Sequence, residues 1–169
     1  MVHSGKSIVF IGFMGAGKTT VGKLVAQKLN RKFIDTDEVI EKEFNMPIPQ
    51  VFNKYGEKVF REKEKSVITD LSGKTNLVLS LGGGAFLQEE IRSACLSNST
   101  VIFLDISFES WKERLDLIID NRPVLQGKSI EETLELYQNR QEVYVNHHIK
   151  IKVDYKNPEE IADEILATL

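Results

Sequence analysis

The chain has 169 residues, of which 41% are hydrophobic and 28% are charged, and its formal net charge at pH 7 is −3. This length fits one domain with its own core, and the lack of a basic excess argues against nucleic-acid and membrane-surface partners. The single cysteine excludes an internal disulfide, and the apolar run at residues 8–13 is too short for a signal peptide or a membrane span, so a cytoplasmic protein is expected.

Short runs of β-branched and other apolar residues alternate with longer helical patterns along the chain. The predicted strands cover residues 7–12, 32–35, 76–81, 100–105 and 149–153. The predicted helices cover residues 18–30, 36–44, 49–71, 88–96, 107–119, 130–145 and 158–169, with breaks at 46–48 and 55–56.

The predicted strands are apolar throughout and are separated by helices, which is typical of a parallel sheet covered on both faces. We therefore expect one doubly wound α/β domain over residues 1–169. Ligands of such sheets bind beyond the carboxyl ends of the strands. The residues that follow each strand are thus the candidates for function.

The first strand runs into Gly12-Phe13-Met14-Gly15-Ala16-Gly17-Lys18-Thr19, which matches the P-loop pattern G-x-x-x-x-G-K-[ST]. Glycines let backbone N–H groups approach phosphate oxygens, and the following helix directs its positive end at the same anion. Lys18 would add a full positive charge, and the Thr19 hydroxyl is suited to bind Mg²⁺. The pattern predicts a nucleoside triphosphate site.

Two carboxylates, Asp35 and Asp37, follow the second strand. One interpretation is helix capping, because acidic residues favour helix amino termini. Beside a P-loop, the alternative is that one carboxylate assists Mg²⁺ while the other orients an acceptor hydroxyl and takes its proton.

Three consecutive glycines, Gly82, Gly83 and Gly84, follow the third strand, with Ser80 as the nearest polar residue. They suit a place where backbone lies close to a ligand, although a simple turn is the alternative. Asp105 ends the fourth strand and resembles a metal-assisting aspartate. We do not expect it to bind metal, because that strand can lie on the far side of the first.

Three arginines are candidates for binding an anionic substrate: Arg61, Arg122 and Arg140. Arg61 and Arg140 lie in helical patterns, so a solvated helix face is the simple alternative for each. Arg122 lies in a polar loop before a proline, which suits a lid over phosphates at about residues 120–128. Guanidinium groups also bind a carboxylate through two parallel hydrogen bonds.

Together these segments resemble one family, the shikimate kinases, over nearly the whole chain. The resemblance rests on GFMGAGKTT at 12–20, FIDTD at 33–37, YGEKVFREKE at 55–64, LSLGGG at 79–84, NRPVL at 121–125 and NRQEVY at 139–144. It implies a three-layer αβα fold of the P-loop kinase type, with a five-stranded parallel sheet in the order 2-3-1-4-5. It also implies a monomer that phosphorylates the 3-hydroxyl of shikimate with ATP and Mg²⁺.

The resemblance also implies roles for individual residues. The phosphate-binding residues would be Gly15, Ala16, Gly17, Lys18, Thr19 and Thr20, with Arg122 closing over the phosphates. Thr19 and Asp35 would serve the metal, Asp37 would be the base, and Arg114, Lys156 and Pro158 would flank adenine. The substrate would lie on Asp37, Arg61, Arg140 and the three glycines, supported by Glu64, in a helical segment at about 36–72.

The chain departs from the family pattern at two points. Thr19 stands where serine is common, which keeps the hydroxyl, and Lys156 stands where arginine is frequent. Two rival functions stay open: a kinase for another small hydroxy acid such as gluconate, and a nucleotide-binding module without catalysis. We expect no metal site at His147 and His148, and we expect Trp111 and Cys95 to pack in the core.

Overall fold

The structure, a computed structural model, describes residues 5–114 and 129–169. Its helices and strands, in chain order, are β1 (Ile8–Ile11), α1 (Lys18–Leu29), β2 (Lys32–Asp35), α2 (Thr36–Phe44), α3 (Ile48–Tyr55), α4 (Glu57–Ser72), β3 (Leu77–Ser80), the 3₁₀ turn η1 (Ala85–Leu87), α5 (Glu89–Asn98), β4 (Thr100–Asp105), α6 (Phe108–Glu113), α8 (Ile130–Tyr144), β5 (Ile149–Lys152) and α9 (Pro158–Thr168).

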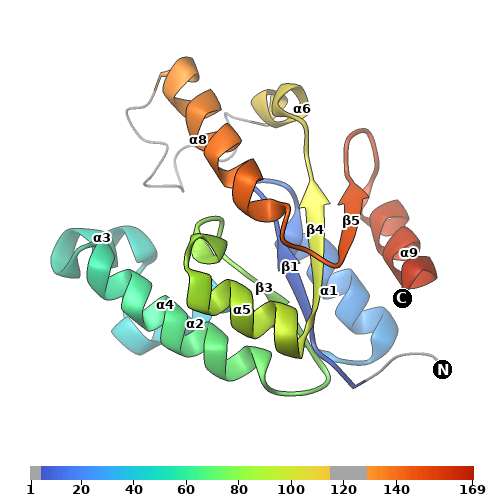
Figure 1. Cartoon of the computed structure of the whole chain (residues 1–169), viewed down its shortest axis with the longest axis horizontal. Coiled ribbons are helices and arrows are strands. Elements are labelled where there is room, and N and C mark those ends of the chain that lie inside the picture. Colours follow the sequence, from blue (N-terminus) through green and yellow to red (C-terminus); the bar gives the residue numbers. More distant parts are fainter. Residues whose placement is uncertain (1–4, 115–128) are drawn as a thin grey trace.

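The five strands form one sheet in the order β2-β3-β1-β4-β5, and every neighbouring pair is parallel. Helices α1 and α9 pack together on one side of the sheet, and α5 and α8 lie on the other (Figure 1). These layers confirm the predicted three-layer α/β fold and its strand order. None of the helices in the described ranges is long and apolar enough to cross a lipid bilayer.

The central strands are buried on both faces, which explains why their sequences are apolar without alternation. All four residues of β1 are buried, as are residues 101–104 of β4. Helix α1 can approach the sheet closely because Gly22 faces Phe33: a Cβ at Gly22 would lie only 2.6 Å from the Phe33 ring. Cys95 and Trp111 are fully buried, as predicted.

Local sequence determines most helix boundaries. Ser129 and Glu132 form a reciprocal capping box at the start of α8, and Asn157 and Glu160 do the same for α9, whose first residue is Pro158. The predicted breaks within 36–71 are confirmed, because α2 ends at Phe44 and α3 begins at Ile48, and Gly56 with φ of 87° separates α3 from α4.

Some predicted boundaries were wrong. The helix predicted over 107–119 begins at Phe108, since Ser107 caps it from outside, and it ends at Glu113. Residues 115–119 lie outside the described residues. The turn η1 was not predicted, because its three residues carry no periodic pattern. The other strand and helix ends differ from prediction by a few residues at most.

The strand register brings three loops together. Ser80 is opposite Phe10 of β1 and opposite Asp35 of β2, so β1, β2 and β3 end at the same edge of the sheet. The loops that follow them therefore start side by side. Asp105 ends β4 on the other side of β1, where its carboxylate accepts from Gln141 Nε2 at 3.3 Å. It lines neither of the pockets at the edge formed by β1, β2 and β3.

Candidate active site

The loop between β1 and α1 is held from outside by side chains of α6 and its end. Trp111 Nε1 donates to the Met14 carbonyl at 2.8 Å, and Arg114 Nη1 donates to the Gly15 carbonyl at 2.7 Å. In a trans peptide the N–H points away from the C=O, so the carbonyl that Trp111 holds turns the Gly15 N–H toward the inside of the loop, whereas the Ala16 N–H donates to the Phe13 carbonyl at 3.1 Å. The loop thereby presents backbone donors for an anion at the amino terminus of α1.

Lys18 lies across the start of this loop. Its Nζ donates to the carbonyl of Gly12 and, at 3.3 Å, to that of Phe13. Gly12 itself has no room for a side chain, because a Cβ would lie 2.6 Å from the Leu104 carbonyl oxygen. The ammonium group is thus folded over the loop within reach of any phosphate that the loop holds.

The capping interpretation of Asp35 is confirmed, and its role at a metal stays a prediction. Its Oδ1 caps α2 by accepting from the backbone N–H groups of Asp37, at 2.9 Å, and Glu38. Its Oδ2 accepts from the Thr19 hydroxyl at 3.1 Å. The capping bond therefore fixes the carboxylate so that its second oxygen faces the phosphate loop.

The oxygens of Thr19, Asp35 and Asp37 line a small hollow together with Ser80 and Lys18. Hydroxyl and carboxylate oxygens suit a hard divalent cation such as Mg²⁺, which usually completes its shell with water and substrate phosphates. The described residues contain no group of three or more His, Cys, Asp or Glu side chains that could hold a metal alone. The donor set therefore fits a magnesium ion that arrives with a phosphate ligand.

Asp37 lies between this hollow and a larger pocket, and it lines both. Its carboxylate is packed against the backbone of Gly82, where a Cβ would lie 2.8 Å from Oδ1. Any side chain at position 82 would push the carboxylate away. Close contact with the Asp37 carboxylate thus favours glycine here, and the segment also forms a turn, in which the Ala85 N–H donates to the Gly82 carbonyl at 3.2 Å.

Arg61 and Glu64 form an ion pair inside the pocket wall. Arg61 Nη1 lies 2.8 Å from Glu64 Oε1, and the Glu64 side chain is only 1% exposed. Gln88 holds the pair by donating to Glu64 Oε1 at 3.1 Å and to the Arg61 carbonyl at 3.0 Å. Burial raises the pKa of Glu64, and the charge of Arg61 partly offsets that rise. The solvated-face interpretation of Arg61 was therefore wrong.

Arg140 is buried as well, although α8 is mostly solvated around it. Only 6% of the residue is exposed, and burial lowers the pKa of its guanidinium, which still remains charged because arginine pKa values are so high. A Cβ at Gly83 would lie 3.5 Å from Arg140 Nη1, and one at Gly84 would lie 2.7 Å from Arg61 Nη2. The glycine loop thus runs directly beside both guanidinium groups.

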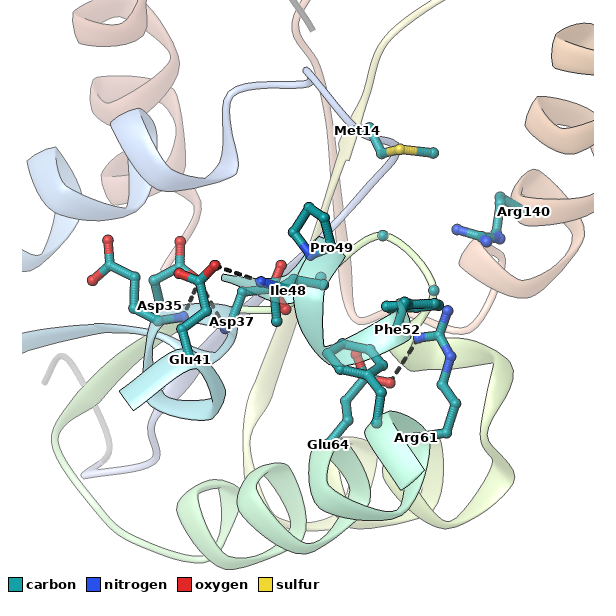
Figure 2. Close-up of a pocket in the computed structure, with 15 residues that line it drawn as sticks. Met14, Asp35, Asp37, Glu41, Ile48, Pro49, Phe52, Arg61, Glu64 and Arg140 are labelled. Atoms are coloured by element: carbon teal, nitrogen blue, oxygen red, sulfur yellow. Dashed lines mark hydrogen bonds and ion pairs between the residues drawn. The ribbon is translucent and has the colours of Figure 1, made fainter. Parts of the chain in front are cut away.

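These groups line one pocket of about 240 Å³. Figure 2 shows Asp35, Asp37 and Glu41 on one side of it and the guanidinium groups of Arg61 and Arg140 on the other. The apolar side chains of Met14, Ile48, Pro49, Phe52 and Phe60 complete the lining. A small molecule with a carboxylate at one end and a hydroxyl at the other would match this division of charge.

The remaining predicted residues lie by the phosphate loop, away from the two pockets at this edge, or outside the described part. Thr20 is exposed in the first turn of α1, and Arg114 contacts the loop through Gly15. Lys156 pairs with Glu164 at 2.9 Å, and Pro158 begins α9; neither residue lines the two pockets at this edge. Arg122 and the lid predicted at 120–128 lie outside the described residues.

Several residues of the site were not found from the sequence. Gln88 braces the ion pair, and Glu41 joins α2 to α3 by accepting from the Ile48 N–H at 2.8 Å. Trp111 was predicted only to pack, yet it also holds the phosphate loop. Tyr144 donates to carbonyls of two loops. A buried tryptophan or tyrosine is expected to find a hydrogen-bond partner, but sequence does not say which one.

Comparisons with known proteins agree on one family. A family model described as "Shikimate kinase" matches residues 14–169. A shikimate kinase of Bacillus pumilus is 53% identical over 165 residues, which cover 97% of this chain and 89% of that protein. A solved shikimate kinase of Acinetobacter baumannii, in complex with shikimate, superposes with a TM-score of 0.91 at 34% identity over 96% of this chain and 92% of that one. A gluconokinase of Sinorhizobium meliloti shares the fold with a TM-score of 0.56 at 17% identity, covering 96% of this chain and 90% of its own.

Proposed function

This chain belongs to the shikimate kinase family, and we propose how the residues of its site divide the work of the family's reaction. The chain is an ATP-dependent kinase that transfers the γ-phosphoryl group of ATP to the 3-hydroxyl of shikimate and yields shikimate 3-phosphate and ADP. The observation that carries the residue roles is the pocket beside the phosphate loop, where Asp37 faces the buried guanidinium of Arg140 and the partly exposed one of Arg61.

We propose that the phosphates of ATP bind to the backbone of Gly15–Thr20 and to Lys18. The hydrogen bond from Trp111 to the Met14 carbonyl supports this role, because it turns the Gly15 N–H toward the inside of the loop. Arg114, Lys156 and Pro158 would flank adenine, and Arg122 would cover the phosphates from the lid. The adenine-flanking role and the lid role both rest on the family resemblance.

For shikimate, we propose that its carboxylate binds between Arg61 and Arg140 and that its ring lies along Gly82–Gly84. This orientation directs the hydroxyl groups at Asp37, on the opposite side of the pocket. The 3-hydroxyl oxygen then forms a bond to the γ-phosphorus as the bond to the β-phosphate oxygen breaks, and the hydroxyl proton passes to the Asp37 carboxylate. Positioning of this kind supplies much of the rate enhancement.

Magnesium would be held by Thr19 directly and by Asp35 through water. The fit rests on the oxygen donors that line the hollow beside the loop. A magnesium ion held there would offset the negative charge of the phosphates. Lys18, which lines the same hollow, would add a second positive charge.

We further propose that residues 1–169 form one domain, with segment 36–72 as the substrate-binding part and 120–128 as the lid. A cytoplasmic enzyme without a nucleic-acid partner is supported by the net charge of −3 and the single cysteine, whereas the monomeric state rests on the family resemblance. Size-exclusion chromatography with light scattering tests the monomer, and a dimer mass would contradict it.

One experiment separates the acceptors. ADP release from the purified protein is followed with ATP and Mg²⁺ in the presence of shikimate, gluconate or neither. We expect turnover with shikimate only. Turnover with gluconate alone would point to the rival kinase, and binding of ATP without turnover on either acid would point to a module without catalysis.

A further inference from the structure

The hydroxyl group of Tyr144, in the last turn of α8, contacts both loops of the site. It donates to the Gly83 carbonyl, 2.6 Å away, and lies 3.0 Å from the Gly12 carbonyl. Gly12 begins the phosphate loop after β1, whereas Gly83 is the middle glycine of the loop after β3. Both carbonyls thus contact the side chain of Tyr144, which is more than sixty positions away from either glycine in the sequence.

Tyr144 has little freedom to leave this position. The residue is 1% exposed, and its ring packs against Phe103 of β4 with the ring centres 5.1 Å apart. A tyrosine hydroxyl carries a single proton, so at any moment it donates one full hydrogen bond and shares its position between the two carbonyls. A shift of either loop therefore changes the hydrogen bond that the hydroxyl makes to the other loop.

Two charged groups of the site meet the same cluster. Lys18 Nζ donates to the Gly12 carbonyl that Tyr144 also contacts. Arg140 lies one helical turn before Tyr144, and a Cβ at Gly83, whose carbonyl Tyr144 holds, would lie 3.5 Å from Arg140 Nη1. The phosphate-binding lysine and the carboxylate-binding arginine are thus linked through Gly12 and Tyr144.

We propose that Tyr144 is a positioning residue that couples the nucleotide site to the shikimate site. Ligand binding at the phosphate loop orders Gly12, and through the hydroxyl it orders Gly83 and Arg140 before shikimate arrives. The second ligand then loses less conformational entropy on binding, which gives positive coupling without a large movement. This coupling presupposes the proposed function, because it needs nucleotide on the loop after β1 and shikimate beside Gly83.

The test compares Tyr144→Phe with Tyr137→Phe. Tyr137 is a matched control, because it is a largely buried tyrosine of the same helix whose hydroxyl donates to the Ile106 carbonyl and to neither site loop. Isothermal titration calorimetry gives the Kd of shikimate without ADP and with saturating ADP, and the ratio of the two values measures coupling. Steady-state assays give kcat and both KM values.

We expect the wild-type ratio to be about fivefold or more, in the usual range for coupled sites. Tyr144→Phe should bring the ratio to within about twofold of one and lower kcat about tenfold, while each ligand alone binds within about threefold of wild type. Tyr137→Phe should keep the wild-type ratio. A simple loss of packing or stability would affect both variants and would weaken single-ligand binding as well.

Three results would overturn the coupling role: a wild-type ratio of one, a full ratio in Tyr144→Phe, or an equal loss in Tyr137→Phe. If circular dichroism shows that Tyr144→Phe does not fold, amide hydrogen exchange of the wild-type protein decides. ADP alone should then protect the peptide that covers 81–85, and unchanged exchange there would refute the coupling. Failure of wild type to bind shikimate or ADP singly would instead contradict the proposed function, and the coupling with it.

Discussion

Replacing Arg61 by alanine should raise the KM for shikimate about 30- to 150-fold and leave the KM for ATP within about threefold. Losing one partner of a buried charge pair costs about 2–5 kcal/mol of binding. The Arg61 side chain is 20% exposed, and Arg140 remains beside the same glycine loop, so we take about 2–3 kcal/mol. At about 1.4 kcal/mol per tenfold change, this free energy gives the stated range.

The same substitution has a second consequence, which must be separated from binding. It leaves Glu64, 1% exposed, without the guanidinium at 2.8 Å, so the pKa of this carboxyl should rise further and the fold should lose stability. The double variant Arg61→Ala/Glu64→Gln removes that stranded charge. We expect the double variant to recover most of the thermal stability and none of the affinity for shikimate.

The assay is initial-rate ADP release with shikimate varied at saturating ATP, together with thermal unfolding of each variant. If the KM for shikimate stays at the wild-type value in Arg61→Ala, Arg61 does not bind the substrate carboxylate. If the double variant regains a normal KM for shikimate, the single variant had only distorted the pocket. The proposed binding of the substrate carboxylate by Arg61 would be wrong in that case too.

The other predictions concern Asp37, Lys18, Glu64 and Gly84. Asp37→Asn should lower kcat by about 10²- to 10⁴-fold in the ADP-release assay, because a carboxamide cannot take the hydroxyl proton; near-normal turnover would exclude Asp37 as the base. Lys18→Met should lower kcat by on the order of 10²-fold or more with an unchanged circular dichroism spectrum, and retained activity would contradict its phosphate role. Because burial raises the pKa of Glu64, acidification should protonate it and raise the KM for shikimate at a higher pH than an ordinary glutamate would allow, and the pH profile of Glu64→Gln should lack this step. The effect of pH on stability has the opposite direction. Because the pKa of Glu64 is raised in the folded state, this group favours folding most at low pH, and its contribution is lost as the pH rises from the usual glutamate pKa through the folded-state pKa. Unfolding of wild type and Glu64→Gln at several pH values would detect this change. Gly84→Ala places a Cβ 2.7 Å from Arg61 Nη2 and should raise the KM for shikimate roughly tenfold with little loss of thermal stability, since the clash is with the end of a flexible side chain; an unchanged KM would show that the guanidinium can move without cost to binding.

The nucleotide half of the site could be predicted from sequence because its parts are local. The phosphate loop draws its glycines, lysine and threonine from eight consecutive residues between a strand and a helix. Asp35 and Asp37 follow the next strand directly, and their capping role was expected from the same few residues. Backbone donors and a helix end need no distant partner in order to form an anion site.

The substrate half could not be predicted in this way. From the sequence, Arg61 and Arg140 each fit a solvated helix face equally well. Only the packing of α4 and α8 beside the glycine loop buries Arg140 and leaves the Arg61 side chain no more than 20% exposed. Three residues that hold the site together by hydrogen bonds belong to no recognisable motif: Gln88, Trp111 and Tyr144. Their hydrogen bonds join residues 24 to 132 positions apart, and no local pattern encodes such a pairing.

Sequence by itself determined the class of fold, the order of elements and the phosphate loop, because periodicity, capping and glycine spacing act within a few residues. The tertiary structure alone decided that Asp37 and two guanidinium groups face each other across one pocket, and that one tyrosine touches both loops. These outcomes depend on strand register and on helices packing across the sheet. Burial then gives Glu64 and Arg140 their altered electrostatics, since the same charges would be hydrated and weakly interacting on an open helix face.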